Sequence, residues 1–226
     1  MQHFRLGLIL IFCLLTATQL FATHNRAGEI LFELIAPFTY RATIVTYTDS
    51  RSIPADRDSL RIDWGDGVTE FVARTNGPDN DNNGVPDGEL LGNNIKVNIY
   101  VKTHQYAGAL PFYIISMGDP NRNADICNIT NSVQVPFYLE DTIFFQDPAL
   151  IGFNTSPILL NPPVDFAVQG VPFIHNPNAY DPDGDSLVFS FTVPKATAVN
   201  NVPGYQFPDQ IDPGPDNTFT IDSKTG

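Results

Sequence analysis

The chain has 226 residues, of which 25 are acidic and 12 are basic, so its formal net charge at pH 7 is −13. Nucleic acid is excluded as a partner and an anionic membrane surface is disfavoured, because binding to either requires a basic surface. The length allows one large domain or two small ones.

The N-terminal segment is typical of a secretory leader. A short positive stretch at residues 1–5 is followed by a uniformly apolar run at residues 6–15, and then by small and polar residues. We therefore expect a signal peptide at residues 1–22, cleaved after Ala22, and a secreted or cell-surface protein. The apolar run is too short to cross a bilayer, which needs roughly 20 residues, and the mature chain offers no other transmembrane segment. Cys127 is then the only cysteine left, so an internal disulfide is not possible.

After the leader, apolar and polar residues alternate in short runs between turn residues, which is the pattern of an all-β protein. Helices are not expected, because 19 prolines and 16 glycines leave few uninterrupted windows of helical length. In residues 40–48, for example, one face would carry Tyr40, Ala42, Ile44 and Thr46. The expected strands are residues 29–35, 40–48, 60–64, 68–74, 95–103, 111–117 and 133–140. This number of strands suits a β-sandwich of immunoglobulin-like architecture.

A second β unit is expected after a short linker at residues 147–155, where Asp147-Pro148 interrupts the strand pattern. This division gives a first domain at residues 23–146 and a second at residues 156–226. The strands expected in the second unit are residues 157–160, 170–175, 187–193 and 218–221.

A run of carboxylates in the second unit is the first candidate metal site. Asp181, Asp183 and Asp185 occupy alternate positions around Gly184. Like charges this close are unfavourable unless water solvates them or a cation is shared, and oxygen ligands around a glycine bend are what Ca²⁺ prefers. Calcium is therefore the expected ligand. The alternative is a solvated Asp-Gly turn before a strand.

A second candidate calcium loop lies in the first domain, between the fourth and fifth expected strands. Asp79, Asp81, Asn83 and Asp87 supply oxygen donors at alternate positions of a calcium-loop pattern, with Gly84 at its bend. The last position of the pattern is leucine where glutamate is usual, and no helix flanks the loop, so an EF-hand is not expected. A looser calcium loop and a long, flexible acidic loop are the two alternatives left open.

Two motifs in the first domain, with the strand that follows them, resemble the PKD family of β-sandwich domains. They are RIDWGDG at residues 61–67 and HQY at residues 104–106. The family pairs a Trp-x-Phe-Gly-Asp-Gly hairpin with a His-x-Tyr strand. Here Ile62 stands at the usual Trp position and Trp64 at the Phe position. The resemblance implies a PKD-like sandwich in which the histidine has a packing role.

Longer segments are similar to exported proteins of gliding bacteria that use type IX secretion. These segments are residues 23–30, 119–123, 131–138 and 177–187, which spread over nearly the whole mature chain. In addition, FTIDSKTG at residues 219–226 resembles the Phe-x-Ile-Asp-x-x-Thr-Gly of cadherin-like, immunoglobulin-like modules, in which a further strand follows the glycine. The resemblance implies a link to gliding motility and a second unit that is incomplete at its C-terminus and less stable.

The aromatic residues suggest one further function, a surface on which carbohydrate rings stack. Those in turn-rich segments, Tyr180, Tyr205 and Phe207, are the better candidates for exposure. Those within strand runs are expected in the core; they are Phe71, Tyr100, Phe112, Phe137 and Phe189.

No signature of a serine hydrolase, a zinc protease, a phosphate-binding loop or a dinucleotide-binding fold is found in the sequence. We therefore expect a non-enzymatic, structural or adhesive, modular β protein that is stiffened by calcium. Its expected partners are a cell-surface protein or a polysaccharide. The alternative is a carbohydrate-binding accessory region of a secreted hydrolase.

Overall fold

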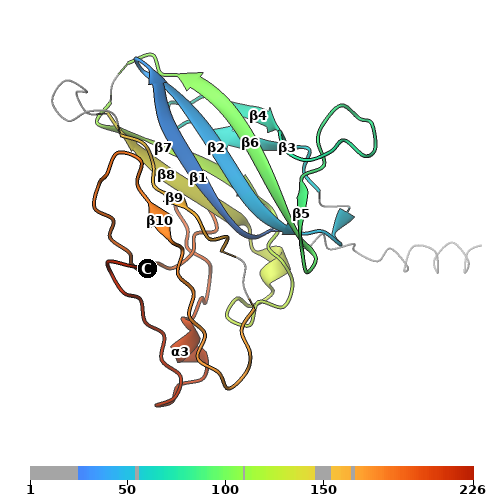
Figure 1. Ribbon diagram of the computed structural model, residues 1–226, viewed down its shortest axis with the longest axis vertical. Coiled ribbons are helices and arrows are strands. Elements are labelled where there is room, and N and C mark those ends of the chain that lie inside the picture. Colours follow the sequence, from blue (N-terminus) through green and yellow to red (C-terminus); the bar gives the residue numbers. More distant parts are fainter. Residues whose placement is uncertain (1–24, 54–55, 109, 146–153, 164–165) are drawn as a thin grey trace, which may run out of the picture.

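The computed structural model describes residues 25–53, 56–108, 110–145, 154–163 and 166–226. Within these residues the chain consists mainly of strands and irregular segments, and every sheet is antiparallel (Figure 1). The all-β fold class is therefore confirmed. The expected signal peptide and most of the expected linker lie outside the described residues. No helix in the described part of the chain has the length and apolar character needed to cross a membrane.

Two four-stranded sheets form a sandwich, one with the order β1-β2-β6-β5 and the other with the order β4-β3-β7-β8. The first sheet consists of β1 (Asn25–Ala36), β2 (Thr39–Asp49), β5 (Glu89–Gly92) and β6 (Ile95–Gln105). The second consists of β3 (Ser59–Asp63), β4 (Thr69–Ala73), β7 (Phe112–Asp119) and β8 (Phe137–Phe144). Each strand expected in the first unit is present, with shifted ends. β5 was not expected, because its residues are all exposed and show no alternation; pairing with β6 orders it.

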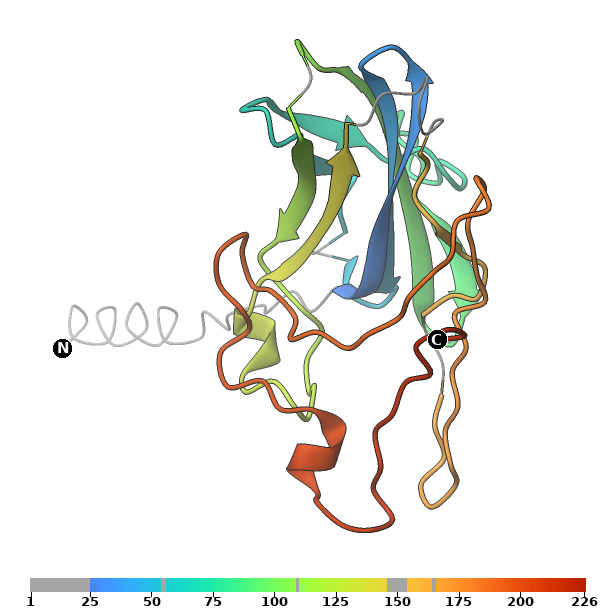
Figure 2. The ribbon, with the colours of Figure 1, turned by 90° about the vertical axis from the view of Figure 1, so that its left-hand side faces the viewer.

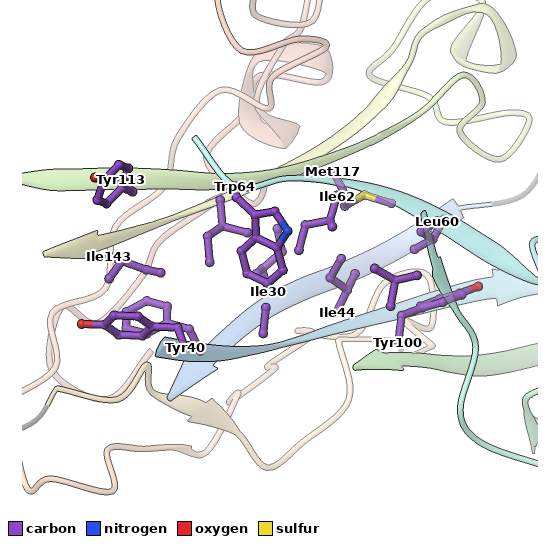
Figure 3. Packing of buried hydrophobic residues seen from close by; sticks show 14 of the residues in the cluster. Ile30, Tyr40, Ile44, Leu60, Ile62, Trp64, Tyr100, Tyr113, Met117 and Ile143 are labelled. Carbon is purple, nitrogen blue, oxygen red and sulfur yellow. The ribbon is translucent and has the colours of Figure 1, made fainter. Parts of the chain in front are cut away.

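The core lies between the two sheets, where their inward side chains meet (Figure 3). Tyr40, Ala42 and Ile44 of β2 are buried, as their alternation predicts. Trp64, which directly follows β3, is fully buried in this cluster. Burying one large apolar side chain contributes roughly 1.5–3 kcal/mol, so this cluster is the main source of stability in the sandwich.

The turn between β3 and β4 brings the hairpin close to β7. The N–H of Trp64 donates to the carbonyl of Val68 at 3.0 Å, and Asp66 Oδ1 accepts the N–H of Val68 at 3.0 Å. Gly65 has a φ of +77°, and a Cβ there would lie 2.5 Å from the carbonyl oxygen of Ile114. Glycine is therefore required at this position by both the backbone conformation and the close approach of β7.

The C-terminal part of the chain has little regular structure. Its elements are β9 (Ile158–Leu159), β10 (Ala179–Tyr180) and the one-turn helix α3 (Pro208–Ile211). The strands expected at residues 170–175, 187–193 and 218–221 require correction, because none of these segments forms a strand. Eleven of the 19 prolines lie in residues 156–226, and a residue without an N–H interrupts a ladder of hydrogen bonds.

This C-terminal part is attached to the sandwich at several points (Figures 1 and 2). The N–H of Ser156 donates to the carbonyl of Phe32 at 2.9 Å, and the Ser156 hydroxyl accepts the N–H of Phe32 at 2.7 Å. A small apolar cluster of Ile129, Val135, Ala196 and Val202 joins the two parts. A second sandwich and the boundaries between two domains stay predictions.

Candidate functional site

The first candidate calcium loop directly follows β10. Asp181 is buried, and its Oδ1 accepts the backbone N–H groups of Asp183 at 2.9 Å and Asp185 at 3.2 Å. The Oδ2 of Asp183 accepts the N–H of Thr155 at 2.6 Å. The bend at Gly184 has a φ of +84°, which favours glycine. The loop is thus closed on its own first carboxylate and tied to the segment that leaves the sandwich.

The second candidate loop connects β4 to β5 and turns its oxygen donors toward shared backbone N–H groups. The N–H of Asn83 is shared by Asp79 Oδ1 and Asp81 Oδ1, at 3.1 Å from each. The N–H of Gly84 donates to Asp79 Oδ2 at 3.0 Å, and Asp87 Oδ2 accepts a further backbone N–H at 2.7 Å. These N–H groups partly compensate the carboxylates, because a row of backbone N–H groups attracts anions.

Asp58 also reaches this loop, although it was not among the predicted residues. The side-chain amide of Asn83 donates to Asp58 Oδ2 at 3.2 Å and to Asp81 Oδ2 at 3.1 Å. Asp58 directly precedes β3, whereas the loop follows β4. No local pattern could have found this residue, because only the pairing of β3 with β4 brings it to the loop.

The two ends of the loop are held together by backbone contacts. The N–H of Asp87 donates to the carbonyl of Pro78 at 2.6 Å, and the N–H of Gly88 donates to the carbonyl of Asn76 at 3.0 Å. Gly77 has a φ of +89°, and a Cβ there would lie 2.1 Å from the Gly88 carbonyl oxygen. The residues of the calcium pattern therefore project from a closed and narrow base.

Arg74 anchors that base from inside the sandwich, where its side chain is fully buried. Its Nη1 donates to Asp56 Oδ1 at 2.8 Å and to Asn98 Oδ1 at 3.0 Å. Its Nη2 donates to Asp58 Oδ1 at 3.0 Å, and its Nε donates to the carbonyl of Pro86. A buried guanidinium is tolerated when anions and carbonyls satisfy its donors. Sequence reasoning missed this role, because Arg74 is typical of a polar residue at the end of a strand.

Asp56 is the main anion beside Arg74. Burial by itself would raise the pKa of Asp56, but hydrogen bonds from Arg74 and Lys96 outweigh burial and lower that pKa below its ordinary value. Lys96 Nζ lies 2.6 Å from Asp56 Oδ1. The two cations compensate the carboxylates at the base of the loop, so the excess negative charge lies at Asp79 and Asp81.

Neither loop forms a finished metal cage. Within the described residues, no three His, Cys, Asp or Glu side chains stand together in a way that could hold a metal ion. A cation would therefore bind only if the carboxylates exchanged their bonds to backbone N–H groups for bonds to the ion.

The histidine of the PKD-like motif packs beside the β3–β4 turn. The ring of His104 lies on Trp64, with centroids 4.7 Å apart and planes at 15°. Its Nε2 lies 2.7 Å from Asp66 Oδ2. Burial would raise the pKa of Asp66, but the hydrogen bond and charge of His104 and the N–H of Val68 together outweigh burial and lower that pKa. These contacts close one end of the core.

Segments that carry the resemblance to exported proteins of gliding bacteria meet at the opposite end of β3. Asn25 Nδ2 donates to the carbonyl of Asn121 at 3.3 Å. The buried guanidinium of Arg122 donates to the carbonyls of Pro136 at 3.1 Å and Lys195 at 2.9 Å. One arginine thus joins the segment after β7, the segment before β8 and the C-terminal part of the chain.

The exposure of the aromatic residues corrects one expectation. Tyr100 and Phe137 are buried as expected, but Phe71 and Phe112 are 71% and 49% exposed. Both lie on the outer face of the second sheet, because they alternate with the buried residues of β4 and β7. Phe189 is half-buried. Of the residues expected at the surface, Tyr180 is exposed, and Tyr205 and Phe207 are half-buried.

No protein-family model, curated protein or solved structure matches this chain. The resemblance to PKD domains, to cadherin-like modules and to exported proteins of gliding bacteria therefore stays a hypothesis drawn from motifs.

Proposed function

We propose that this chain is a non-enzymatic, exported β protein with a structural or adhesive role at the cell surface. The proposal is supported by the leader-like N-terminus, by the similarity of long segments to exported proteins of gliding bacteria, and by a sandwich with long surface loops. Its role is mechanical: the sandwich and the attached C-terminal part keep a spacing and present loops to a cell-surface protein or a polysaccharide. The same similarity connects it with gliding motility.

Calcium is the stiffening ligand in this proposal, and the loop of Asp79, Asp81, Asn83 and Asp87 is its first binding site. One observation carries this assignment: the carboxylates of Asp79 and Asp81 converge on a single backbone N–H, 3.1 Å from each. Two anions repel each other at this spacing, and an N–H offers only a partial charge. Ca²⁺ takes about six to eight oxygen ligands and would neutralise both carboxylates. Asp58 adds a further oxygen donor beside the loop.

The loop of Asp181, Asp183 and Asp185 is the second calcium site of the proposal. Its carboxylates lie around one tight bend, and Asp183 is bonded to Thr155. An ion at this position would stiffen the attachment of the C-terminal part. Modules that work outside cells bind calcium at roughly 10⁻⁴ to 10⁻³ M, so occupancy would depend on the medium.

Titration calorimetry and thermal unfolding of the mature chain test the calcium proposal. Calcium at ten to a hundred times its Kd should stabilise the fold by about 1.4 to 2.7 kcal/mol, and a chelator should reverse this. Replacing Asp79 and Asp81 together by Asn should remove the heat assigned to the first site. Asp183→Asn should remove that of the second. Asp216→Asn is the matched control, because it removes a carboxylate that is exposed and outside both loops.

The calcium proposal fails if millimolar Ca²⁺ produces no heat and the chelator leaves the melting temperature unchanged. It also fails if the loop variants bind as strongly as Asp216→Asn, because the ion would then bind elsewhere. If no heat is found, the proposal is reduced to a structural role that does not involve calcium.

A further inference from the structure

We propose that the outer face of the second sheet binds a neutral polysaccharide. This outer face consists of the side chains of β3, β4, β7 and β8 that point away from the core. The proposal rests on the adhesive role proposed above and names its partner and its surface, but it does not depend on calcium and does not use either acidic loop.

An aromatic row crosses the outer face from one edge to the other. Phe71 of β4 pairs with Arg61 of β3, and Gly118 of β7 pairs with Tyr138 of β8. Arg61 lies beside Gly118, because the next residue along β3, Ile62, pairs with the residue before Gly118. Neighbouring strands are about 4.8 Å apart, so two aromatic rings stand at the ends of a row roughly 14 Å long. Gly118 has no side chain, and the ring of Tyr138 lies against it, 3.8 Å from where a Cβ would stand.

A hydrogen-bonding row runs beside the aromatic row, two residues further along each strand. Asp63 pairs with Thr69 on one side and with Ser116 on the other, and Ser116 pairs with Glu140. Two residues along a strand span about 6.6 Å. Glu140 also pairs with Lys195 of the C-terminal part, and Asp63 Oδ1 accepts the N–H of Gly65 at 2.9 Å. The outer face therefore sets an ion pair, a carboxylate and hydroxyls next to aromatic rings, at a distance that one ligand could span.

A second aromatic pair lies at the far end of the outer face. Phe112 and Phe144 pair across β7 and β8, with ring centroids 6.3 Å apart, and both are about half exposed. Ile114 lies between this pair and the hydrogen-bonding row. Apolar and polar rows thus alternate along the strands.

A sugar polymer fits this alternation better than a protein surface does. Each sugar ring offers an apolar face that can stack on an aromatic side chain, and a rim of hydroxyl groups that can bond to carboxylates and to a guanidinium. A protein interface, in contrast, has a continuous core that is depleted of charged residues. The net charge of −13 repels polyanions, which leaves a neutral polymer as the fitting partner.

Affinity electrophoresis of the mature chain tests this proposal, with hydroxyethylcellulose, arabinoxylan or dextran in the gel and alginate as the polyanion. We expect retardation by at least one neutral polymer and none by alginate. Phe71→Ala and Arg61→Ala should each weaken the retarding interaction about tenfold or more, because each removes a central contact. Leu90→Ala is the matched control, since it truncates an equally exposed apolar residue on β5, outside the outer face.

Three outcomes would overturn the proposal. The first is migration unchanged by all three neutral polymers. The second is retardation that Phe71→Ala leaves intact while its circular dichroism and melting temperature match those of the unsubstituted chain. The third is a concentration-dependent dimer in analytical ultracentrifugation that Phe71→Ala dissociates, because a second copy would then cover the outer face.

Discussion

Arg74 connects the stability of the sandwich with the shape of its acidic loop. It is fully buried, and its donors are taken by Asp56, Asp58, Asn98 and a loop carbonyl. A buried ion-pair network contributes little more to the stability of a fold than well-packed apolar residues in its place would. Removing only one partner is costly, however, because the other charges are then buried without compensation.

Arg74→Met should therefore destabilise the fold by about 3–5 kcal/mol, because it leaves Asp58 and the buried amide of Asn98 without their cation and Asp56 with Lys96 alone. Urea unfolding at neutral pH measures this. Arg41→Met is the control: its pair with Glu33 is exposed on both sides, and such a pair contributes about 1 kcal/mol or less. Equal losses in the two variants would contradict the role given to Arg74.

Asp141 is a carboxylate on the core-facing side of a strand, where a charge is unfavourable. It lies on β8 in the inward register of Phe137 and Ile143, and burial raises its pKa to about 6. The N–H of Thr142 donates to Asp141 Oδ1 at 2.7 Å, and this hydrogen bond only partly opposes the effect of burial on the pKa. An inward charge on an edge strand discourages pairing with other chains.

Asp141→Asn should raise stability at pH 7 by roughly 1–3 kcal/mol, because the folded state then no longer holds a buried charge. The gain should shrink as the pH falls from 6 to 4, where Asp141 is protonated. Urea midpoints measured from pH 4 to pH 8 check this. The exposed Glu89→Gln should leave the midpoint unchanged. A gain that does not depend on pH would contradict the assignment of the cost to charge.

At the scale of elements, the β3–β4 hairpin depends on the glycine that faces β7. Gly65→Ala should cost more than about 1 kcal/mol, because its φ is positive and its Cβ would meet the backbone of Ile114. Gly67→Ala is a close control: its φ is +91°, but no atom lies within 4 Å of its Cβ. The difference between their urea midpoints isolates the contact with β7. Equal midpoints would show that the hairpin can move away from β7 without a loss of stability.

The attachment of the C-terminal part depends on the segment between β7 and β8. Arg122 bonds to carbonyls on both sides of this junction and lies over the ring of Phe137, 5.2 Å from its centroid. Lysine could not keep these contacts, because an ammonium group lacks the planar fork of donors.

Arg122→Lys should therefore expose residues 194–206 to proteolysis without unfolding the sandwich. Limited proteolysis with mass spectrometry should find cleavage in this range several times faster than in the unsubstituted chain, while the β-sheet circular dichroism is kept. Lys224→Met is the control, because it removes an exposed cation of the C-terminal part outside this range. Cleavage at the same rate in all three chains would show that Arg122 does not hold this segment.

For the whole molecule, carboxylates whose pKa values are shifted in opposite directions set the dependence of stability on pH. Hydrogen bonds from Arg51 lower the pKa of Asp49, and basic partners lower those of Asp56 and Asp66. These groups stabilise the fold above their ordinary pKa near 4, and that contribution is lost as the pH falls through their lowered values. Asp141 acts in the opposite sense, because its cost appears as the pH rises from 4 to 6.

Stability should therefore be greatest near pH 4, fall between pH 4 and about pH 6 as Asp141 loses its proton in the unfolded state, and fall again below pH 4. Chemical unfolding across this range locates the maximum. In Asp141→Asn the fall between pH 4 and pH 6 should be smaller, while the fall below pH 4 is unchanged. A steady rise from pH 4 to pH 8 would contradict this balance.

The alternation of residues 29–140 was enough to predict an all-β sandwich and the approximate bounds of its main strands. Period two is a local property, so it survives whatever the strands later pack against. The same reasoning predicted too many strands in the C-terminal part. Its runs alternate as strands do, but a strand also needs a partner with free N–H and carbonyl groups, and prolines remove many of the donors there.

The tertiary structure decided which face of each strand is covered and which distant residues meet. Alternation says that Phe71 and Val72 point to opposite sides, but only the stacking of the sheets buries Val72 and leaves Phe71 in solvent. Pairing between β3 and β4 brings Asp58 and the buried Arg74 to the acidic loop. Such contacts depend on the register and packing of the whole sandwich, which no short window of the sequence contains.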